Sequence, residues 1–123
     1  MGGGLRRLPF PEKIPLMFAR IVDFVSSRGK TRILNETIQN KLLPTLRVQL
    51  GFVDEIVLES DVEPDRFLTL TFWKTREQAE LYNQERYPAV KEVLLASLET
   101  DPVVRTFNVA RCTTRNIAMG RVA

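Results

Sequence analysis

The chain has no histidine among its 123 residues and a single cysteine, Cys112. Histidine is the commonest metal ligand and general base in proteins, and one cysteine cannot form an intramolecular disulfide. These absences argue against a zinc site and against a histidine-dependent catalytic triad. We therefore expect no functional metal and no cofactor, and we interpret Cys112 as a small apolar side chain within a strand.

Long apolar runs are also missing. No stretch approaches the roughly 20 apolar residues that cross a bilayer, and the first residues lack the apolar centre of a signal peptide. The formal net charge of +3 comes from 18 basic and 15 acidic residues, which are interspersed rather than gathered in blocks. Such a balance does not indicate nucleic-acid binding. We expect a cytoplasmic protein that binds neither nucleic acid nor membrane.

The length fits one domain, because single-core domains most often contain about 100–150 residues. Residues 1–14 include three glycines and two prolines and have little to pack, so we predict a flexible N-terminal arm. Residues 15–114 form the predicted domain. Residues 115–123 form a predicted C-terminal tail.

The most informative stretch runs from Phe67 to Tyr82. Residues 67–73 alternate in the period-2 pattern of a strand that buries side chains on both faces. Thr75 then has the features of a helix N-cap. Its hydroxyl is expected to accept from the amide of Gln78, whose side chain reaches back in a capping box. A strand that ends at Trp73 is thus followed almost at once by a helix.

The remaining elements complete a β-α-β-β-α-β order. We predict strands over 16–25, 52–60, 66–73 and 103–112, and helices from about 31 and from 75 to about 98. Pro44 is expected to kink the first helix or to start a short turn that Gly51 ends, and Pro88 to divide the second. Right-handed crossovers place both helices on one face of an antiparallel sheet, which is the α+β ferredoxin-like fold.

Two helices cover only one face of such a sheet, yet the first strand is apolar on both. Phe18, Val22 and Phe24 alternate with a second set, which comprises Met17, Ala19, Ile21 and Val25. The second face therefore needs a cover that the chain does not provide. A second copy of the chain, packed sheet to sheet, is the simplest cover, so we predict a homodimer.

Three passages together resemble the antibiotic-biosynthesis-monooxygenase (ABM) domain family of the dimeric α/β-barrel superfamily. They are the opening strand 18–22, the passage 43–52 in which a proline-containing helix ends at Gly51-Phe52, and residues 68–79, similar to a strand-Trp-x-Ser/Thr-x-Glu-x-Ala signature. The resemblance covers about residues 16–112. It implies a homodimer with a pocket between helices and sheet in each subunit. Some members oxygenate aromatic quinols without metal or cofactor, others degrade haem, and many have no known activity.

Only some of the family's site residues are present at the matching positions of this sequence. Trp73 matches the strand tryptophan of the quinol-oxidising branch, but that branch's asparagine and tyrosine fall on Thr69 and Ala79 here. The asparagine, tryptophan and histidine of the haem-degrading branch fall on three different residue types, Arg20, Tyr82 and Glu92. Haem breakdown by that route is therefore disfavoured.

Oxygenation without a cofactor needs an ionisable phenol, a dry pocket and donors that stabilise developing charge. We predict Trp73 as indole donor and wall, Tyr82 as phenol donor and Arg20 as anion stabiliser. Further candidates for ligand binding are Thr69 and Asn108 as neutral partners and Glu92 as a base. Each has a plain structural interpretation as well: core packing for the aromatics, a solvated helix surface for Glu92.

Two functions remain open at this point. The first is a cofactor-independent monooxygenase-like protein acting on an aromatic phenol or quinol. The second is a non-catalytic dimeric module of the same fold, which binds a small aromatic molecule or serves a structural role. An isomerase of the wider superfamily is a third hypothesis, for which the sequence shows no base.

Overall fold

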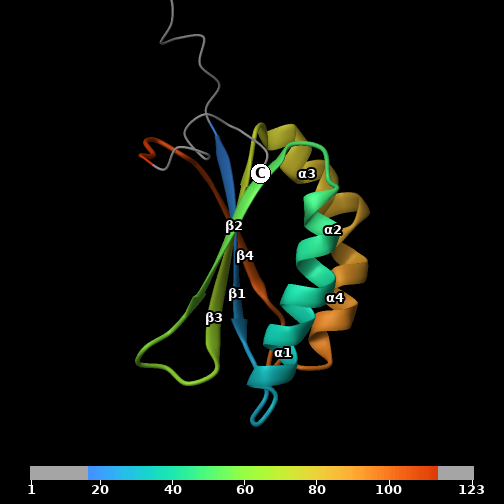
Figure 1. Cartoon of the computed structure of the whole chain (residues 1–123), viewed down its shortest axis with the longest axis vertical. Helices are drawn as coiled ribbons and strands as arrows, with labels where there is room; N and C mark the ends of the chain where they lie inside the picture. The colour runs from blue at the N-terminus through green and yellow to red at the C-terminus, as the bar shows by residue number, and fades with distance from the viewer. Residues whose placement is uncertain (1–16, 114–123) are drawn as a thin grey trace, which may run out of the picture.

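The computed structural model describes residues 17–113, which form one antiparallel sheet covered on one side by helices (Figure 1). The elements are, in order, β1 Phe18–Val25, α1 Thr31–Thr37, the π-helix η3 Ile38–Leu42, α2 Leu43–Arg47, β2 Phe52–Glu59, β3 Arg66–Trp73, α3 Arg76–Glu85, α4 Tyr87–Leu95 and β4 Val103–Asn108. The predicted α+β ferredoxin-like architecture is confirmed. The predicted arm, 1–14, and tail, 115–123, lie outside the described residues.

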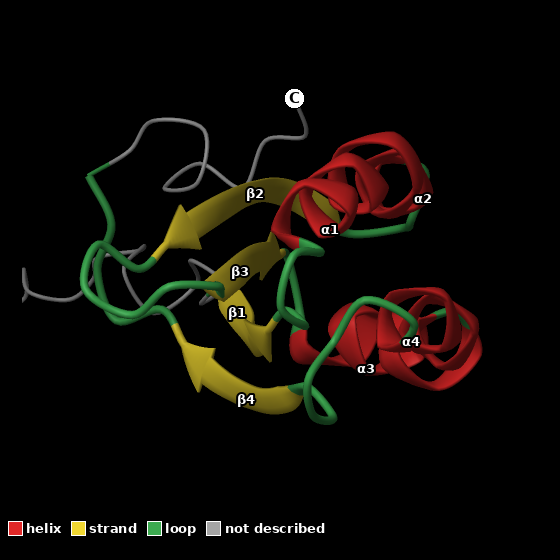
Figure 2. Cartoon of the chain, turned by 90° about the horizontal axis from the view of Figure 1, so that it is seen from below, coloured by secondary structure: helices red, strands yellow, loops and turns green. Residues whose placement is uncertain are grey.

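The four strands are arranged in the order β2-β3-β1-β4, and every neighbouring pair is antiparallel. Both helix groups lie on the same face of the sheet (Figure 2). In the strand register Glu55 pairs with Thr71, Thr71 with Arg20, and Arg20 with Thr106. Residues in register share a face, so these four form a polar row across the helix-facing side of the sheet.

The main core lies between this face and the helices. Its buried members on the sheet include Phe18, Val22, Phe24, Phe67 and Trp73, as the strand alternation predicts. The helices contribute a second buried set, which comprises Leu34, Ile38, Leu42, Leu46, Ala79, Tyr82, Tyr87 and Leu94. Burying these side chains supplies most of the hydrophobic stabilisation, at about 25 cal/mol for each Å² of apolar surface removed from water.

The first helical segment is continuous from residue 31 to 47, with a π-turn directly before Pro44. In an α-helix the proline ring would clash with the carbonyl of Asn40, four residues earlier. The wider π-turn, in which the amide of Leu43 donates to the carbonyl of Ile38, relieves that crowding. Pro44 then occupies the first turn of α2. The predicted irregularity near Pro44 takes the form of a π-turn within a continuous helix, which ends at Arg47 rather than at Leu50.

The second helical segment is divided at Pro88, as predicted, into α3 and α4. The Thr75 hydroxyl accepts from the amide of Gln78 at 3.1 Å, which confirms the N-cap. The reciprocal half of the capping box is wrong, because the Gln78 Oε1 atom has no hydrogen-bond partner among the described residues. Gln78 instead packs against Gly51. None of the described helices is long and apolar enough to cross a membrane.

The last strand is shorter than predicted. β4 ends at Asn108, and Cys112 lies beyond it, so the placement of Cys112 within a strand is wrong. Cys112 is half-buried and packs against a small apolar cluster that includes Phe72 and Val53. β4 is an edge strand paired only with β1 in this sheet, which explains why its residues are exposed.

On the outer face of the sheet, Met17 and Ala19 of the predicted second apolar set are already buried, in a small cluster with Val53 and Phe72, while other apolar residues stay exposed. The register places Ile56, Leu58, Val103 and Phe107 on that face, and each side chain is between 40 and 50% exposed. Isolated apolar residues are ordinary on protein surfaces, but several on one sheet face form a patch. No described helix covers it (Figure 2).

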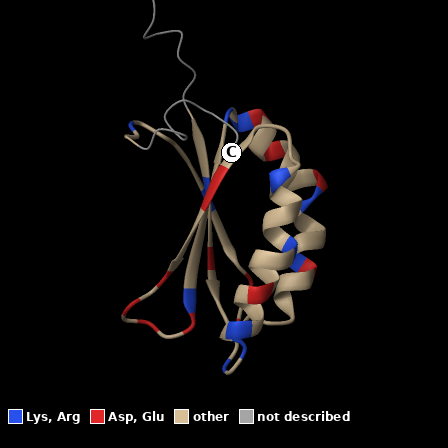
Figure 3. Ribbon diagram, viewed as in Figure 1, with Lys and Arg blue, Asp and Glu red and all other residues tan. Residues whose placement is uncertain are grey.

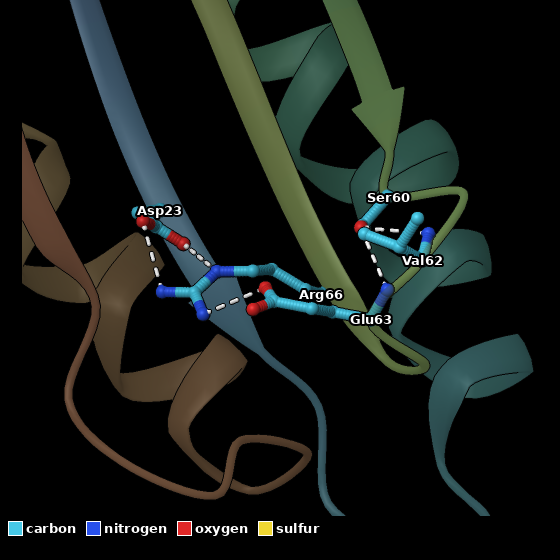
Figure 4. Close-up of polar contacts among 5 residues, drawn as sticks. All are labelled: Asp23, Ser60, Val62, Glu63 and Arg66. Atoms are coloured by element: carbon cyan, nitrogen blue, oxygen red, sulfur yellow. Dashed lines mark hydrogen bonds and ion pairs between the residues drawn. The ribbon is translucent and has the colours of Figure 1, made fainter.

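The connection between β2 and β3 is tied down by polar contacts (Figure 4). The Arg66 guanidinium bonds both carboxylate oxygens of Asp23, at 3.2 and 3.3 Å, and Glu63 at 2.9 Å. The Ser60 hydroxyl accepts from the amides of Val62 and Glu63. Acidic residues gather along this connection, whereas charges of both signs mix over the helices (Figure 3). The hairpin is thus held to β1 by charge-assisted bonds.

Candidate functional site

Trp73, the last residue of β3, is completely buried beneath the helices. Its indole Nε1 donates to the hydroxyl of Thr71 at 2.9 Å, and that hydroxyl donates to the carbonyl of Arg20 at 3.3 Å. The ring of Phe52 meets the indole edge-on with 5.8 Å between centroids. The indole is therefore fixed in orientation by a hydrogen-bond chain that links β3 to β1.

Tyr82 extends from α3 onto the indole, with 5.3 Å between the two ring centroids. It is 2% exposed. Burial raises the pKa of Tyr82 to about 12, although the nearby charge of Arg20 opposes this rise. The side chain is consequently a neutral phenol at physiological pH, able to donate a hydrogen bond.

Arg20 lies in the middle of β1 and is 3% exposed. Its guanidinium carbon is 4.2 Å from the ring centroid of Tyr87 and 5.4 Å from that of Tyr82. Its Nη2 donates to the side-chain oxygen of Asn83 at 2.8 Å. Desolvation lowers the pKa of Arg20, and the two tyrosines partly offset the effect. Arginine nevertheless remains charged.

The charge of Arg20 has no counter-ion within residues 17–113. The carboxylate-containing ion pairs in that range all involve other cations, and the Nε atom of Arg20 is buried with no acceptor there. The hydroxyl of Tyr87 also makes no hydrogen bond of normal geometry within that range. Among the described residues this buried cation is supported by aromatic faces, the nearby Tyr87 hydroxyl and one amide, and its burial costs several kcal/mol before those contacts are counted. The arrangement suits an anion.

A cleft reaches Arg20 from the surface between α3 and β4. Its volume is about 180 Å³, and its lining comprises Phe18, Arg20, Ala79, Glu80, Asn83, Val104 and Thr106. Trp73 and Tyr82 lie behind this lining, closed off by their burial. The cleft therefore offers a path to the guanidinium, and the aromatic pair forms the wall behind it.

Glu55 occupies the β2 end of the polar row. Burial raises the pKa of Glu55 to about 7, with a further rise from the charge of Asp54 and an opposing effect of Arg47. Its Oε2 atom is buried without a partner among the described residues. A carboxyl group that titrates near neutral pH is suited to accept a proton.

The structure brings together the three residues predicted as catalytic: Arg20, Trp73 and Tyr82. Thr69 lies on the same face of the sheet, buried and paired with Val22 rather than in contact with the cluster. Asn108 is exposed at the end of β4, opposite Phe18. Glu92 is exposed on α4. The structure thus leaves Asn108 and Glu92 outside the cluster.

Four members of the cluster were missed by the sequence reasoning: Thr71, Asn83, Tyr87 and Glu55. Thr71 shares the strand parity of Trp73, and Asn83 directly follows Tyr82, so their positions carried a signal. Tyr87 and Glu55 carried none, because their place depends on how α4 and β2 pack over β1. Within the described part of the chain no three His, Cys, Asp or Glu side chains gather as a metal site.

No family model and no curated protein matches this chain by sequence. Solved structures match it by fold. A candidate antibiotic biosynthesis monooxygenase from Nitrosomonas europaea superposes with a TM-score of 0.67 at 19% identity, covering 80% of this chain and 94% of that one. A variant of SnoaB, a cofactor-independent oxygenase from Streptomyces nogalater, gives a TM-score of 0.67 at 13% identity, covering 79% and 96%.

A protein of unknown function from Nitrosomonas europaea is also similar, with a TM-score of 0.69, 14% identity and coverage of 82% and 96%. The chain therefore shares the ferredoxin-like fold of these solved structures. At these identities the similarity establishes the fold, and any activity has to be argued from the site.

Proposed function

We propose that the protein is a cofactor-independent monooxygenase that oxidises an aromatic phenol or quinol. The observation that supports this most directly is Arg20, a buried cation with no carboxylate partner in the described residues, stacked on Tyr87 beside Tyr82 and Trp73. A phenolate is a planar anion that matches the charge of Arg20. Phe18 is the aromatic ring in the cleft lining, which also includes the carboxylate of Glu80. The similarity in fold to a cofactor-independent oxygenase agrees with this function.

The proposed chemistry needs no group beyond the substrate and dioxygen. The phenol loses its proton, and Arg20 stabilises the resulting anion. One electron passes from the anion to dioxygen, and the superoxide and organic radical combine into a peroxide anion. This anion takes up a proton, equivalent to the one lost in the first step, and becomes a hydroperoxide. Loss of water then leaves a carbonyl, so that an aromatic R₂CH₂ and O₂ become R₂C=O and H₂O. Dioxygen is reduced and the ring carbon is oxidised.

Neither Glu55 nor Glu92 lines the Arg20 cleft, so the phenol loses its proton to solvent in this proposal. Glu92 is exposed on α4, whereas the pKa of Glu55 is raised to about 7 by burial. Glu55 lies two strands from Arg20 in the polar row, with Thr71 between them. Tyr82 and Trp73 back the cleft from behind its lining, and the candidate neutral partners Thr69 and Asn108 lie outside that lining.

We also propose that the working unit is a homodimer joined through the outer faces of its two sheets. The support is the exposed apolar set on that face, including Ile56, Leu58 and Phe107, which no described element covers. Two such faces are self-complementary in a twofold arrangement. We place this assembly in the cytoplasm.

Dioxygen uptake tests the enzymatic proposal. Anthrone-like and naphthol-like quinols are added to purified protein without flavin or added metal, and uptake above the spontaneous rate is expected. Arg20→Gln should reduce the rate about 100-fold or more, because it removes the charge that stabilises the anion. Trp73→Phe should reduce it less. Arg28→Gln, which removes a charge from an exposed turn, is the matched control and should retain the full rate.

A second function is favoured by one specific observation. Trp73 is 0% exposed and Tyr82 is 2% exposed, so the aromatic pair is packed as a core. A dimeric module that binds a small aromatic molecule at the Arg20 cleft, without turnover, fits this packing. Suppose that naphtholates bind saturably but dioxygen uptake does not exceed the spontaneous rate. That result would favour the binding module over the enzyme.

A further inference from the structure

A second cavity lies on the helical side of the molecule, between the two helix groups that Figure 2 shows end-on. Its volume is about 280 Å³, near the lower end of ligand pockets, which hold about 300–1,000 Å³. One wall comes from α1, η3 and α2 and the other from α3–α4. The lining comprises Thr37, Lys41, Leu42, Thr45, Arg86, Ala89, Val90, Val93 and Leu94. We call it the interhelical groove, and it shares no residue with the Arg20 cleft.

The floor of the interhelical groove is apolar. Leu42 and Leu94 are buried there, Val90 is half-buried, and Val93 is 47% exposed along the edge. The hydroxyls of Thr37 and Thr45 already donate to the carbonyls of Ile33 and Lys41 in their own helix, so neither is available as a donor to a ligand. The groove therefore offers apolar surface to a ligand but no neutral hydroxyl donor from its described lining.

Two cations face the groove from opposite walls. Lys41 belongs to η3 and Arg86 lies between α3 and α4, and neither forms an ion pair with a residue in 17–113. The same range contributes no carboxylate to the lining. Both side chains are exposed, so solvent screens their mutual repulsion, but each is available to pair with an anion placed between them. The charge of the lining is thus complementary to one anionic headgroup.

The wall that carries Lys41 and Leu42 is the π-helical turn. Single π-turns inside α-helices occur frequently at functional sites. The hydrophobic residues Leu34, Ile38, Leu42 and Leu46 recur every four residues, and an α-helix rotates such a series progressively off one face. The wider π-turn offsets this rotation, which keeps Leu42 on the groove floor while Lys41 stands beside it at the edge.

We propose that the interhelical groove binds a medium-chain carboxylate amphiphile. The alkyl chain lies on Leu42, Val90 and Leu94, and the carboxylate lies between Lys41 and Arg86. The occupant is a single fatty-acid-like anion rather than a quinol, because the described lining has no aromatic ring to stack on. This site is independent of the proposed oxygenation, since Arg20, Tyr82 and Trp73 are absent from it.

Isothermal titration of the full chain with decanoate, below its micelle concentration, tests the proposal. We expect saturable binding of one decanoate per chain. The double variant Lys41→Gln with Arg86→Gln should bind about tenfold or more weakly, because it removes both partners of the carboxylate. Neutral 1-decanol should bind the parent protein and this variant alike. Ala89→Phe, which fills the groove, should weaken both ligands.

Two controls separate binding in the groove from a general attraction of anions to a protein of net positive charge. Arg28→Gln with Lys74→Gln removes the same two charges from exposed positions outside the groove and should leave decanoate affinity unchanged. Trp73→Phe should also leave it unchanged, whatever that variant does to oxygen uptake. Equal decanoate affinity in the parent and the Lys41/Arg86 variant would overturn the proposal. So would an equal loss in the control pair, or titrations without saturation.

Discussion

The guanidinium of Arg20 in β1 lies over the ring of Tyr87 at the start of α4, with 4.2 Å from its carbon to the ring centroid. These residues are 67 positions apart in the chain, and only the packing of α4 over β1 joins them. A desolvated cation–π contact of this kind contributes about 2 kcal/mol. It offsets part of the cost of burying a charge that has no carboxylate partner in the described residues.

Arg20→Met should leave the ligand-free protein as stable as the parent or more stable by about 1–3 kcal/mol, because replacing a buried charge by an apolar side chain removes a desolvation cost. Urea unfolding measures the change. The same variant should lose anion binding at the cleft. A loss of more than about 3 kcal/mol would contradict the interpretation of Arg20 as an unpaired charge kept for a ligand.

Tyr87→Leu tests the cation–π contact itself. It should cost about 2–4 kcal/mol in the parent, since it removes both ring burial and the contact with Arg20. In the Arg20→Met background the cost should be smaller by about 1–2 kcal/mol. Tyr87→Phe retains the ring and should change stability by less than about 1 kcal/mol, because the hydroxyl makes no hydrogen bond of normal geometry among the described residues, although it lies close enough to Arg20 to interact with its charge. Additive effects in the double variant would exclude the coupling.

Glu55 should make the protein less stable as pH rises. Its folded pKa of about 7 lies above the unfolded value near 4.5, so the folded state binds more protons between these values. The free energy of unfolding therefore falls as pH increases from about 4.5 to 7 and stays low above that. Glu55→Gln should remove this dependence and stabilise the protein at pH 8 by about 1–3 kcal/mol. Chemical unfolding at a series of pH values measures both effects.

The control for that series is Glu77→Gln, at an exposed position in the first turn of α3. It should leave the slope between pH 4.5 and 7 unchanged. If Glu55→Gln shows the parent's slope in that range, then Glu55 does not titrate near neutral pH in the folded protein.

Gly51→Ala should be strongly destabilising. Gly51 has φ of +87°, and a Cβ there would lie 2.0 Å from Oε1 and 2.7 Å from Cβ of Gln78. We expect a cost of about 2–4 kcal/mol, the sum of left-handed strain and a clash with a packed side chain. Gly29→Ala is the matched control, with φ of +79° and nothing within 4 Å, and should cost only about 1–2 kcal/mol. In a Gln78→Ala background the clash is removed, so Gly51→Ala should cost about as much as Gly29→Ala. Thermal or urea unfolding measures these costs.

Ile21→Asp should dissociate or precipitate the proposed homodimer. The register places Ile21 on the outer face of the sheet, between Leu70 and Arg105. Burying an unpaired carboxylate in an apolar interface costs about 3–5 kcal/mol. Sedimentation at micromolar concentration measures the assembly, and Val48→Asp, on the opposite side and 79% exposed, is the control. A monomeric parent protein would refute the homodimer.

Much of the fold was predictable from local pattern. The period-2 alternation of residues 67–73, the Thr75 N-cap and the break at Pro88 all appear as predicted, because each depends on side chains close in sequence. The π-turn before Pro44 was not predicted. It relieves the clash of the Pro44 ring with the Asn40 carbonyl, and it also keeps Leu34, Ile38, Leu42 and Leu46 in one core. The length of the last strand was overestimated, because apolar residues continue beyond Asn108. Asn108 already pairs with Phe18, the first residue of β1, so no β1 residue is left to pair with those that follow.

The sequence by itself determined the α+β element order, the two apolar faces of the sheet and the position of Arg20, Trp73 and Tyr82 on one side of it. Alternation and helical spacing are short-range properties, so the amino-acid order specifies them. Only the tertiary structure decided that Arg20 lies under Tyr87 without a counter-ion among residues 17–113, that Glu55 titrates near neutral pH, and that Glu92 and Asn108 are exposed. Burial and charge pairing depend on which distant segments meet. The register of the sheet places Glu55 of β2 in the same row as Arg20, and the packing of the helices places Tyr87 of α4 against it.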